Sequence, residues 1–121
     1  MYEVLFYKNR QGEDLIKDYI YSLYEKGRTS KRDRILANKI VAYIKVLQEY
    51  GTRIGMPVVK HIDGSIWELR PLDNRIFFFY WKDDTFVLLH HFVKKTRKTP
   101  SQEIDNARSK LADFLERAEE K

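Results

Sequence analysis

Residues 66–100 decide the fold of this chain, and they read IWELRPLDNRIFFFYWKDDTFVLLHHFVKKTRKTP. Aromatic and β-branched residues form three runs typical of strands, at residues 67–70, 75–81 and 86–93. The links between these runs are short, so neighbouring strands should pair antiparallel. Basic residues lie at or near the ends of the runs, and the last run continues into KKTRK. The stretch therefore predicts a small antiparallel sheet with cations gathered at one edge or groove.

One more strand and two helices are expected before this stretch. Residues 2–7, YEVLFY, have the composition of a short strand. From Glu13 onward, apolar residues recur at three- and four-residue steps, which indicates a helix that stops at Gly27. A second helix should begin at a cap on Thr29 or Ser30 and end at Gly51. Only a few residues join the two helices, so they should form an antiparallel pair.

The remaining signals complete an α+β domain. Val58 and Val59 begin a short strand, and the pair Asp63-Gly64 is a hairpin signal. The last helix should have Thr99 as its N-cap, Pro100 as its first residue and Gln102 closing a capping box. We expect one domain over residues 1–121, with about four or five strands, two N-terminal helices and one C-terminal helix, in the order β-α-α-β-β-β-β-α.

The charge of the chain favours a polyanionic partner. The 121 residues carry a net charge of +5, and residues 1–100 alone hold 19 Lys and Arg against 12 Asp and Glu. Such a basic body suits nucleic acid or an acidic protein, although a positive charge also serves solubility. The chain has no cysteine, which excludes disulfides, thiolate metal sites and a cysteine nucleophile. No signal peptide or membrane span is expected, so we predict a soluble cytoplasmic protein.

Strand alternation sorts the candidate side chains by face. Glu68 and Arg70 should share one face of their strand, and Arg75 should lie on the same face as the alternate aromatic residues that follow it. In the last strand, alternation groups His90 with Phe92 and Lys94, and Leu89 with His91, Val93 and Lys95.

These residue types would suit RNA cleavage without a metal. That reaction needs a base for the 2′-hydroxyl, cations for the charge that grows on the phosphorus centre, and an acid for the leaving oxygen. The cations could come from Arg70, Arg75, Lys94, Lys95 and Lys98. His90, His91 or Glu68 could move a proton.

Each candidate also has a structural explanation. A histidine in an apolar strand is more often a hydrogen-bonded core residue, and Glu68 with Arg70 or Arg75 is more often a cross-strand ion pair. The run from Lys94 to Lys98 could be a solvated loop. The three histidines have no carboxylates at metal-ligand spacing, so neither a metal site nor a cofactor is expected.

Three segments together resemble a known family of bacterial toxins. They are WELR, RIFFFYW and LLHHFVKKTRKTPSQEIDNA. The chain resembles the RelE/HigB superfamily, in its HigB-like, phage-derived Gp49-like branch, where a strand ending in F-x-K-K-T-x-K-T-P leads into a helix that begins E-I-x-x-A. Those positions are filled here by Phe92, Lys94, Lys95, Thr96, Lys98, Thr99, Pro100, Glu103, Ile104 and Ala107.

The resemblance implies the toxin of a type II toxin–antitoxin system, a metal-independent endoribonuclease that cuts mRNA in the ribosomal A site and arrests growth. It also implies a cognate antitoxin with a helix-turn-helix domain, through which alone the pair would bind operator DNA. By position, Arg75 matches the arginine that contacts the scissile phosphate, and Arg70 and Glu68 match active-site positions on the preceding strand. Lys95 belongs to the catalytic set, and Lys94, Arg97, Lys98 and Phe92 form the expected RNA-binding set.

One departure from the family concerns the general base. Many RelE-type toxins carry a tyrosine near the active site at the end of the chain, but this chain has no Tyr or His from Thr99 onward. The candidates for the base are His90, Glu68 or a lysine. Two other functions are possible on the same fold: a non-catalytic RNA- or DNA-binding module, and a phage-derived interaction protein with a degenerate site.

Overall fold

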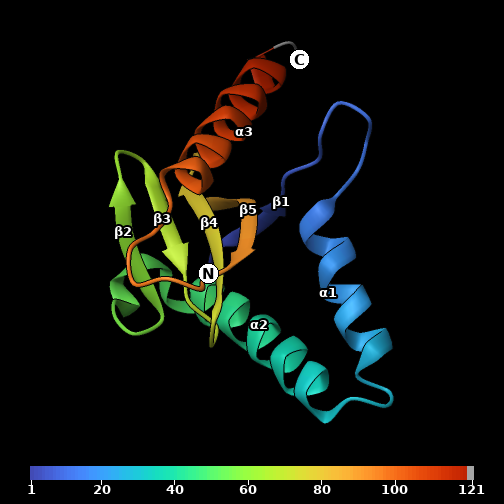
Figure 1. Cartoon of the computed structure of the whole chain (residues 1–121). Helices are drawn as coiled ribbons and strands as arrows, with labels where there is room; N and C mark the ends of the chain where they lie inside the picture. The colour runs from blue at the N-terminus through green and yellow to red at the C-terminus, as the bar shows by residue number, and fades with distance from the viewer. Residues whose placement is uncertain (120–121) are drawn as a thin grey trace.

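A computed structural model describes residues 1–119 of the chain, and its element order is the predicted one (Figure 1). The elements are β1 (Glu3–Phe6), α1 (Leu15–Lys26), α2 (Lys31–Tyr50), a short 3-10 helix η1 (Gly51–Ile54), β2 (Val59–Asp63), β3 (Ile66–Leu69), β4 (Asn74–Tyr80), β5 (Thr85–Val93) and α3 (Ser101–Glu119). The α+β class and the order β-α-α-β-β-β-β-α are confirmed.

The five strands form one mixed sheet in the order β1-β5-β4-β3-β2. Strands β2 to β5 pair antiparallel with their neighbours in sequence, as the short links predicted. Strand β1 instead pairs parallel with β5, with Glu3 opposite Thr85 and Phe6 opposite Leu88. A parallel pair needs a crossover connection, which here runs through both N-terminal helices and the antiparallel strands.

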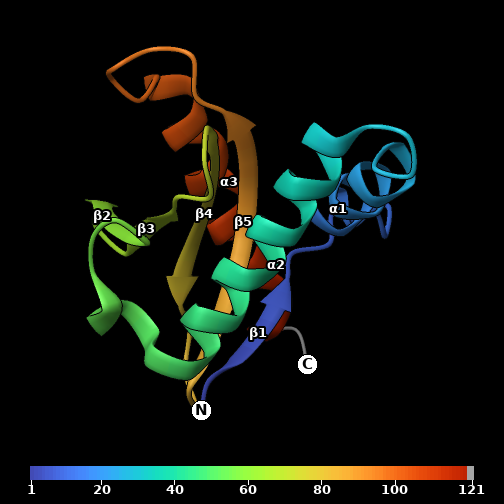
Figure 2. The ribbon, with the colours of Figure 1, turned by 90° about the horizontal axis from the view of Figure 1, so that it is seen from below.

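The sheet lies between two helical layers (Figure 2). Helices α1 and α2 cover one face, where they bury the side chains of Ile76, Phe78 and Leu88. Helix α3 covers the other face and packs on Phe77 and Phe79. Because helices cover both faces, the aromatic run of β4 is buried on both sides, which explains why that strand is continuously apolar.

The helix ends match the predicted signals closely. The side chain of Ser30 accepts a hydrogen bond from the backbone N–H of Asp33 and caps α2, while Gly27 and Gly51 end the two helices. Gly51 has a positive φ of 65°, and a Cβ there would lie 2.8 Å from the ring of Tyr2, so both conformation and space favour glycine. Helix α3 begins at Ser101, one residue later than predicted.

Strand β5 departs from simple alternation at a bulge. The register against β4 shifts between Phe77, which lies opposite His90, and Phe78, which lies opposite Leu88. Leu89 and His90 therefore both face α3, whereas His91 faces α1 and stacks on Tyr19 at a centroid distance of 4.3 Å. The predicted grouping of Leu89 with His91 was wrong, because the bulge inserts one residue into the alternation.

Within the part of the chain that the structure describes, no helix is both long and apolar enough to cross a membrane.

Candidate functional site

The predicted basic residues gather at one end of the inner strands, where β3 ends, β4 begins and β5 ends. This arrangement follows from the antiparallel pairing, which brings the end of one strand next to the start of its neighbour. The backbone N–H of Lys94 donates a 2.8 Å hydrogen bond to the carbonyl of Asp73 and so ties the start of the basic loop to the β3–β4 turn. Figure 2 shows this loop projecting beyond the end of β5, beside the start of β4.

A buried ion cluster lies under this end of the sheet. The side chain of Glu68 is 0% exposed, and its Oε1 lies 3.2 Å from the Nε of Arg70 and 3.7 Å from the Nε of Arg75. Within residues 1–119, neither carboxylate oxygen of Glu68 and neither of these Nε atoms makes a well-aligned hydrogen bond. The cluster is therefore held by charge, with one carboxylate compensating two guanidinium groups.

Arg75 is fixed in place by the turn before it. Its Nη1 donates 2.8 Å hydrogen bonds to the carbonyls of Leu72 and Asn74. Burial lowers the pKa of Arg75 from its ordinary value, and the charge of Glu68 opposes that shift. An arginine keeps its proton in proteins, so Arg75 is an oriented cation whose side chain is 11% exposed.

The same arginine opens onto a surface groove of about 770 Å³, which we call the basic groove. Its lining consists of Arg32, Leu72, Asp73, Arg75, Lys94, Lys95, Thr96 and Arg97. Five of these eight side chains are cations and one is a carboxylate, so the groove suits an anion such as a phosphodiester. The hydroxyl of Thr96 donates a 2.7 Å hydrogen bond to the carbonyl of Lys98 and shapes the loop.

The basic groove contains one cation that the sequence did not single out as a site residue. Arg32 belongs to the first turn of α2, and nothing in the spacing of the sequence connects it with the β3–β4 turn. Conversely, Lys98, which the sequence predicted, lies on the same loop but outside the lining of the groove.

His90 lies between β5 and α3, where both ring nitrogens have partners. Its Nε2 is 3.0 Å from Oε1 of Glu103, and its Nδ1 is 2.9 Å from Nζ of Lys110. This arrangement fits a neutral ring that donates from Nε2 and accepts at Nδ1. Burial lowers the pKa of His90, the hydrogen bond to Glu103 opposes the shift, and the charge of Lys110 adds to it. Burial also lowers the pKa of Lys110.

Phe92 also belongs to the interior. Its side chain is 9% exposed and packs at 5.2 Å, between ring centroids, against Phe77 in the layer under α3. Phe92 belongs to the expected RNA-binding set, but its ring lies in the core, because α3 covers that face of the sheet.

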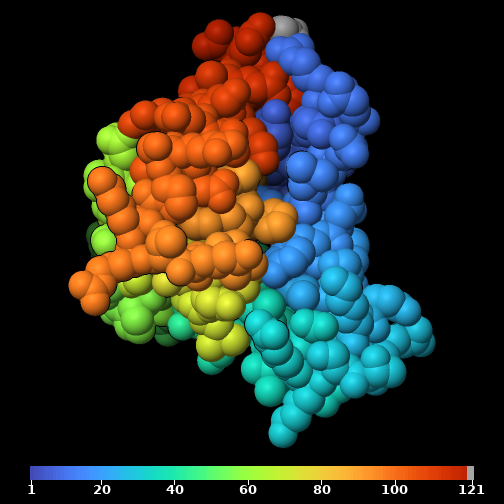
Figure 3. All heavy atoms as spheres, in the orientation of Figure 1, coloured from blue at the N-terminus to red at the C-terminus, as the bar shows by residue number. Residues whose placement is uncertain are grey.

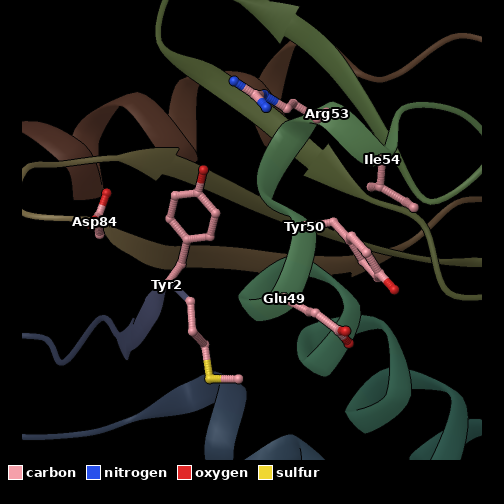
Figure 4. Close-up of a pocket in the computed structure, with 7 residues that line it drawn as sticks. Tyr2, Glu49, Tyr50, Arg53, Ile54 and Asp84 are labelled. Atoms are coloured by element: carbon pink, nitrogen blue, oxygen red, sulfur yellow. The ribbon is translucent and has the colours of Figure 1, made fainter.

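A separate hollow of about 540 Å³ lies elsewhere on the molecule, between the end of α2, the start of the chain and the β4–β5 turn (Figure 4). Its lining is Met1, Tyr2, Glu49, Tyr50, Arg53, Ile54 and Asp84. None of the site residues predicted from the sequence belongs to it. The candidate site is therefore the basic groove with the ion cluster beneath it.

Comparison with known protein families gives a match over most of the chain. The family model described as "Phage derived protein Gp49-like (DUF891)" matches residues 29–112, which is 84 of the 121 residues. The matched segment runs from just before α2 into α3 and contains every residue that lines the basic groove. No curated protein matches the chain.

Proposed function

Because the chain belongs to the Gp49-like family of phage-derived proteins, within the RelE/HigB-like toxin family, we propose that it is the toxin of a type II toxin–antitoxin system. Its proposed activity is cleavage of mRNA on the ribosome without a metal, which stops translation and growth. The proposed partners are ribosome-bound mRNA and a cognate helix-turn-helix antitoxin, through which the pair would reach operator DNA. A cytoplasmic location follows from these partners.

The orientation of Arg75 is the observation that carries this proposal. Two backbone carbonyls and the buried carboxylate of Glu68 hold its guanidinium beside a groove that Lys94, Lys95 and Arg97 also line. Cleavage by the 2′-hydroxyl builds negative charge on the non-bridging oxygens of the scissile phosphate. A cation fixed before the reaction stabilises that charge without further reorganisation.

We assign proton transfer to a side chain that is exposed in the groove rather than to the buried Glu68 or to His90. Glu68 is fully buried beneath the arginines, and the ring nitrogens of His90 are occupied by α3, so neither group faces the groove. We therefore give Glu68 and Arg70 a positioning role toward Arg75. Lys95 is exposed in the groove and is our candidate for the acid that protonates the leaving 5′-oxygen. Positioning of the mRNA by the ribosome would supply much of the remaining rate.

Inducible expression in a bacterium that lacks the antitoxin tests this function. Wild type, Arg75→Ala and Arg53→Ala would be compared for growth and, by primer extension, for new 5′ ends within translated codons of an abundant mRNA. Arg53 is an exposed arginine in the separate hollow, so it controls for loss of positive charge. Arrest with new ends in wild type and Arg53→Ala, but not in folded Arg75→Ala, is the expected result. Full cleavage by folded Arg75→Ala would contradict the proposal.

The positions of Glu68 and His90, two of the candidates for the general base, away from the groove also favour a second function. A module that only binds RNA or DNA would need the cations of the groove but no general base. In the same experiment it would give arrest without new 5′ ends, or no arrest together with salt-sensitive binding in vitro.

A further inference from the structure

A second hollow adjoins the basic groove and differs from it in chemistry. It has a volume of about 360 Å³, and its lining is Lys31, Arg32, Ile35, Leu36, Leu72 and Asp73. Three of these residues, Arg32, Leu72 and Asp73, also line the basic groove, so the two spaces lie side by side. Figure 3 shows the corresponding surface: the orange loop after β5, the yellow-green turn before β4 and the cyan start of α2 lie next to one another.

Aliphatic side chains form the floor of this hollow. Ile35 on α2 is 46% exposed and Leu72 on the β3–β4 turn is 52% exposed. Leu36 adds a partly buried side chain that packs against the main core. Aliphatic groups held at the surface with cations at their rim are typical of a ligand site in which an apolar part is attached to an anionic part.

The backbone conformation of Leu72 gives a second reason to regard the hollow as a binding site. Leu72 has a positive φ of 56°, a conformation that residues with a Cβ adopt rarely and that glycine adopts readily. Its carbonyl accepts the hydrogen bond from Nη1 of Arg75. A glycine would supply that carbonyl equally well, so the turn itself has no need of a leucine side chain. What the side chain adds is the apolar wall of the hollow.

The charges around the hollow favour a base over a second phosphate. The carboxylate of Asp73, whose Oδ1 accepts a hydrogen bond from the Asn74 amide, is the one acidic group in the linings of both spaces. In the hollow this carboxylate is set against two cations, Lys31 and Arg32, whereas in the basic groove it is set against five. The hollow therefore attracts a phosphate less strongly than the groove, and its carboxylate can accept an N–H from the edge of a nucleobase. The guanidinium of Arg32 lies at the boundary, where it can contact a phosphate on one side and stack on a base plane on the other.

We propose that this hollow binds the nucleobase of the nucleotide next to the phosphate held in the basic groove, in single-stranded RNA. The proposal rests on the proposed function, since it assumes that the groove takes an RNA phosphate. Leu72, Ile35 and Arg32 would contact the base. The β3–β4 turn would then contact both the base and the adjacent phosphate.

Paired binding measurements on the full-length protein test the proposal. Fluorescence anisotropy would give the affinity for a labelled single-stranded 12-nucleotide RNA, and competition would give the affinity for linear inorganic polyphosphate, which has charge but no bases. Ile35→Ala removes a side chain that lines the hollow but not the basic groove, so it should leave polyphosphate binding within about twofold of wild type. It should weaken RNA binding by about fivefold or more, the loss expected when one base contact is removed. Leu72→Gly keeps the carbonyl and relieves the backbone, so it should fold and should show the same loss of RNA binding.

The matched control is Asp83→Gly, which makes the same kind of change at another positive-φ residue, in the β4–β5 turn. It should change neither affinity. Unchanged RNA binding by folded Leu72→Gly and Ile35→Ala would overturn this inference and leave the proposed function standing. An equal loss of RNA and polyphosphate binding in Ile35→Ala would also overturn it, because the side chain would then act through the groove. Failure of the wild type to bind either polymer would reject the proposed function itself.

Discussion

At the residue scale, Glu68 shows how one buried charge organises an exposed site. Its carboxylate lies within ion-pair distance of both Arg70 and Arg75, and its side chain is buried. Isolated charges are costly to bury, so each member of such a cluster depends on the others. The position of Arg75 is therefore determined from beneath, by a residue that does not face the basic groove.

Replacing Glu68 with Gln should accordingly cost both stability and activity. Gln keeps the shape but removes the compensating charge, so we expect a loss of about 3 kcal/mol in the free energy of unfolding, measured in urea. The matched control is Glu25→Gln, which breaks an exposed ion pair with Arg28 and should cost less than about 1 kcal/mol. Equal stability of the two variants would show that the buried cluster has no special role.

His91 gives the protein an acid-sensitive stability. Burial, aided by the nearby charges of His90 and Lys110, lowers the pKa of His91 to about 4. In the unfolded chain the ring of His91 binds a proton near pH 6.5, because nothing there lowers its pKa. The contribution of the neutral ring to the free energy of unfolding is therefore complete above that pH and is lost as the pH falls from about 6.5 toward 4. The expected loss from this residue is about 2 kcal/mol, after allowance for partial exposure of the ring.

Thermal unfolding of wild type and His91→Phe over this pH range would isolate the effect. Phe keeps the stacking on Tyr19 but cannot take a proton. The difference between the two curves should grow in favour of the variant as the pH falls from 6.5 to 4. A constant difference would mean that His91 is not the group that titrates.

At the element scale, local patterns in the sequence predicted the strands and helices, but not the positions that depend on how these elements pack together. The strands, the helix stripes and the glycine stops followed from local periodicity and were confirmed. The bulge at Leu89 and His90 could not be predicted, because an inserted residue leaves no local mark and is fixed by packing against α3. Helix α3 also covers His90 and Phe92, two of the candidate site residues, which therefore lie away from the basic groove; for His90 this agrees with the structural explanation given above. Arg32 was missed because only the tertiary fold brings the start of α2 to the β3–β4 turn.

Helix α3 is fully buried at Ala107, which belongs to one apolar cluster with Phe77 and Phe92 of the sheet. Ala107→Leu should overpack this contact and lower the free energy of unfolding by about 1–3 kcal/mol. Ala112→Leu adds the same side chain to an exposed position of the same helix and should change stability by less than about 0.5 kcal/mol. Urea denaturation of both variants checks the prediction, which fails if their midpoints coincide.

At the scale of the whole molecule, the distribution of charge sets how binding responds to salt. Five cations line the basic groove, namely Arg32, Arg75, Lys94, Lys95 and Arg97. If all five contact phosphates of a single strand, the logarithm of the RNA affinity should fall with the logarithm of the salt concentration at a slope of about −3.5. That slope corresponds to a loss of about a hundredfold between about 50 and 200 mM salt.

Titrations of labelled RNA at several salt concentrations would measure this slope. Lys95→Gln should make it shallower by about 0.7, while Lys26→Gln, on the exposed end of α1, should leave it unchanged. A wild-type slope near zero would show that the groove does not bind the RNA backbone.

The parallel pairing of β1 with β5 also determines when a newly made chain can fold. Strand β1 is synthesised first, but its partner is completed only at Val93, and the helix that covers the opposite face follows later still. Contacts between such distant parts of a chain form late, so the nascent polypeptide lacks its complete sheet for most of its translation. The end of the sheet that gathers Arg75 and the basic loop is assembled from the same late strands. A chain of this topology therefore has no assembled basic groove while most of it is still being made, so the proposed cleavage of ribosome-bound mRNA would begin only when synthesis is almost complete.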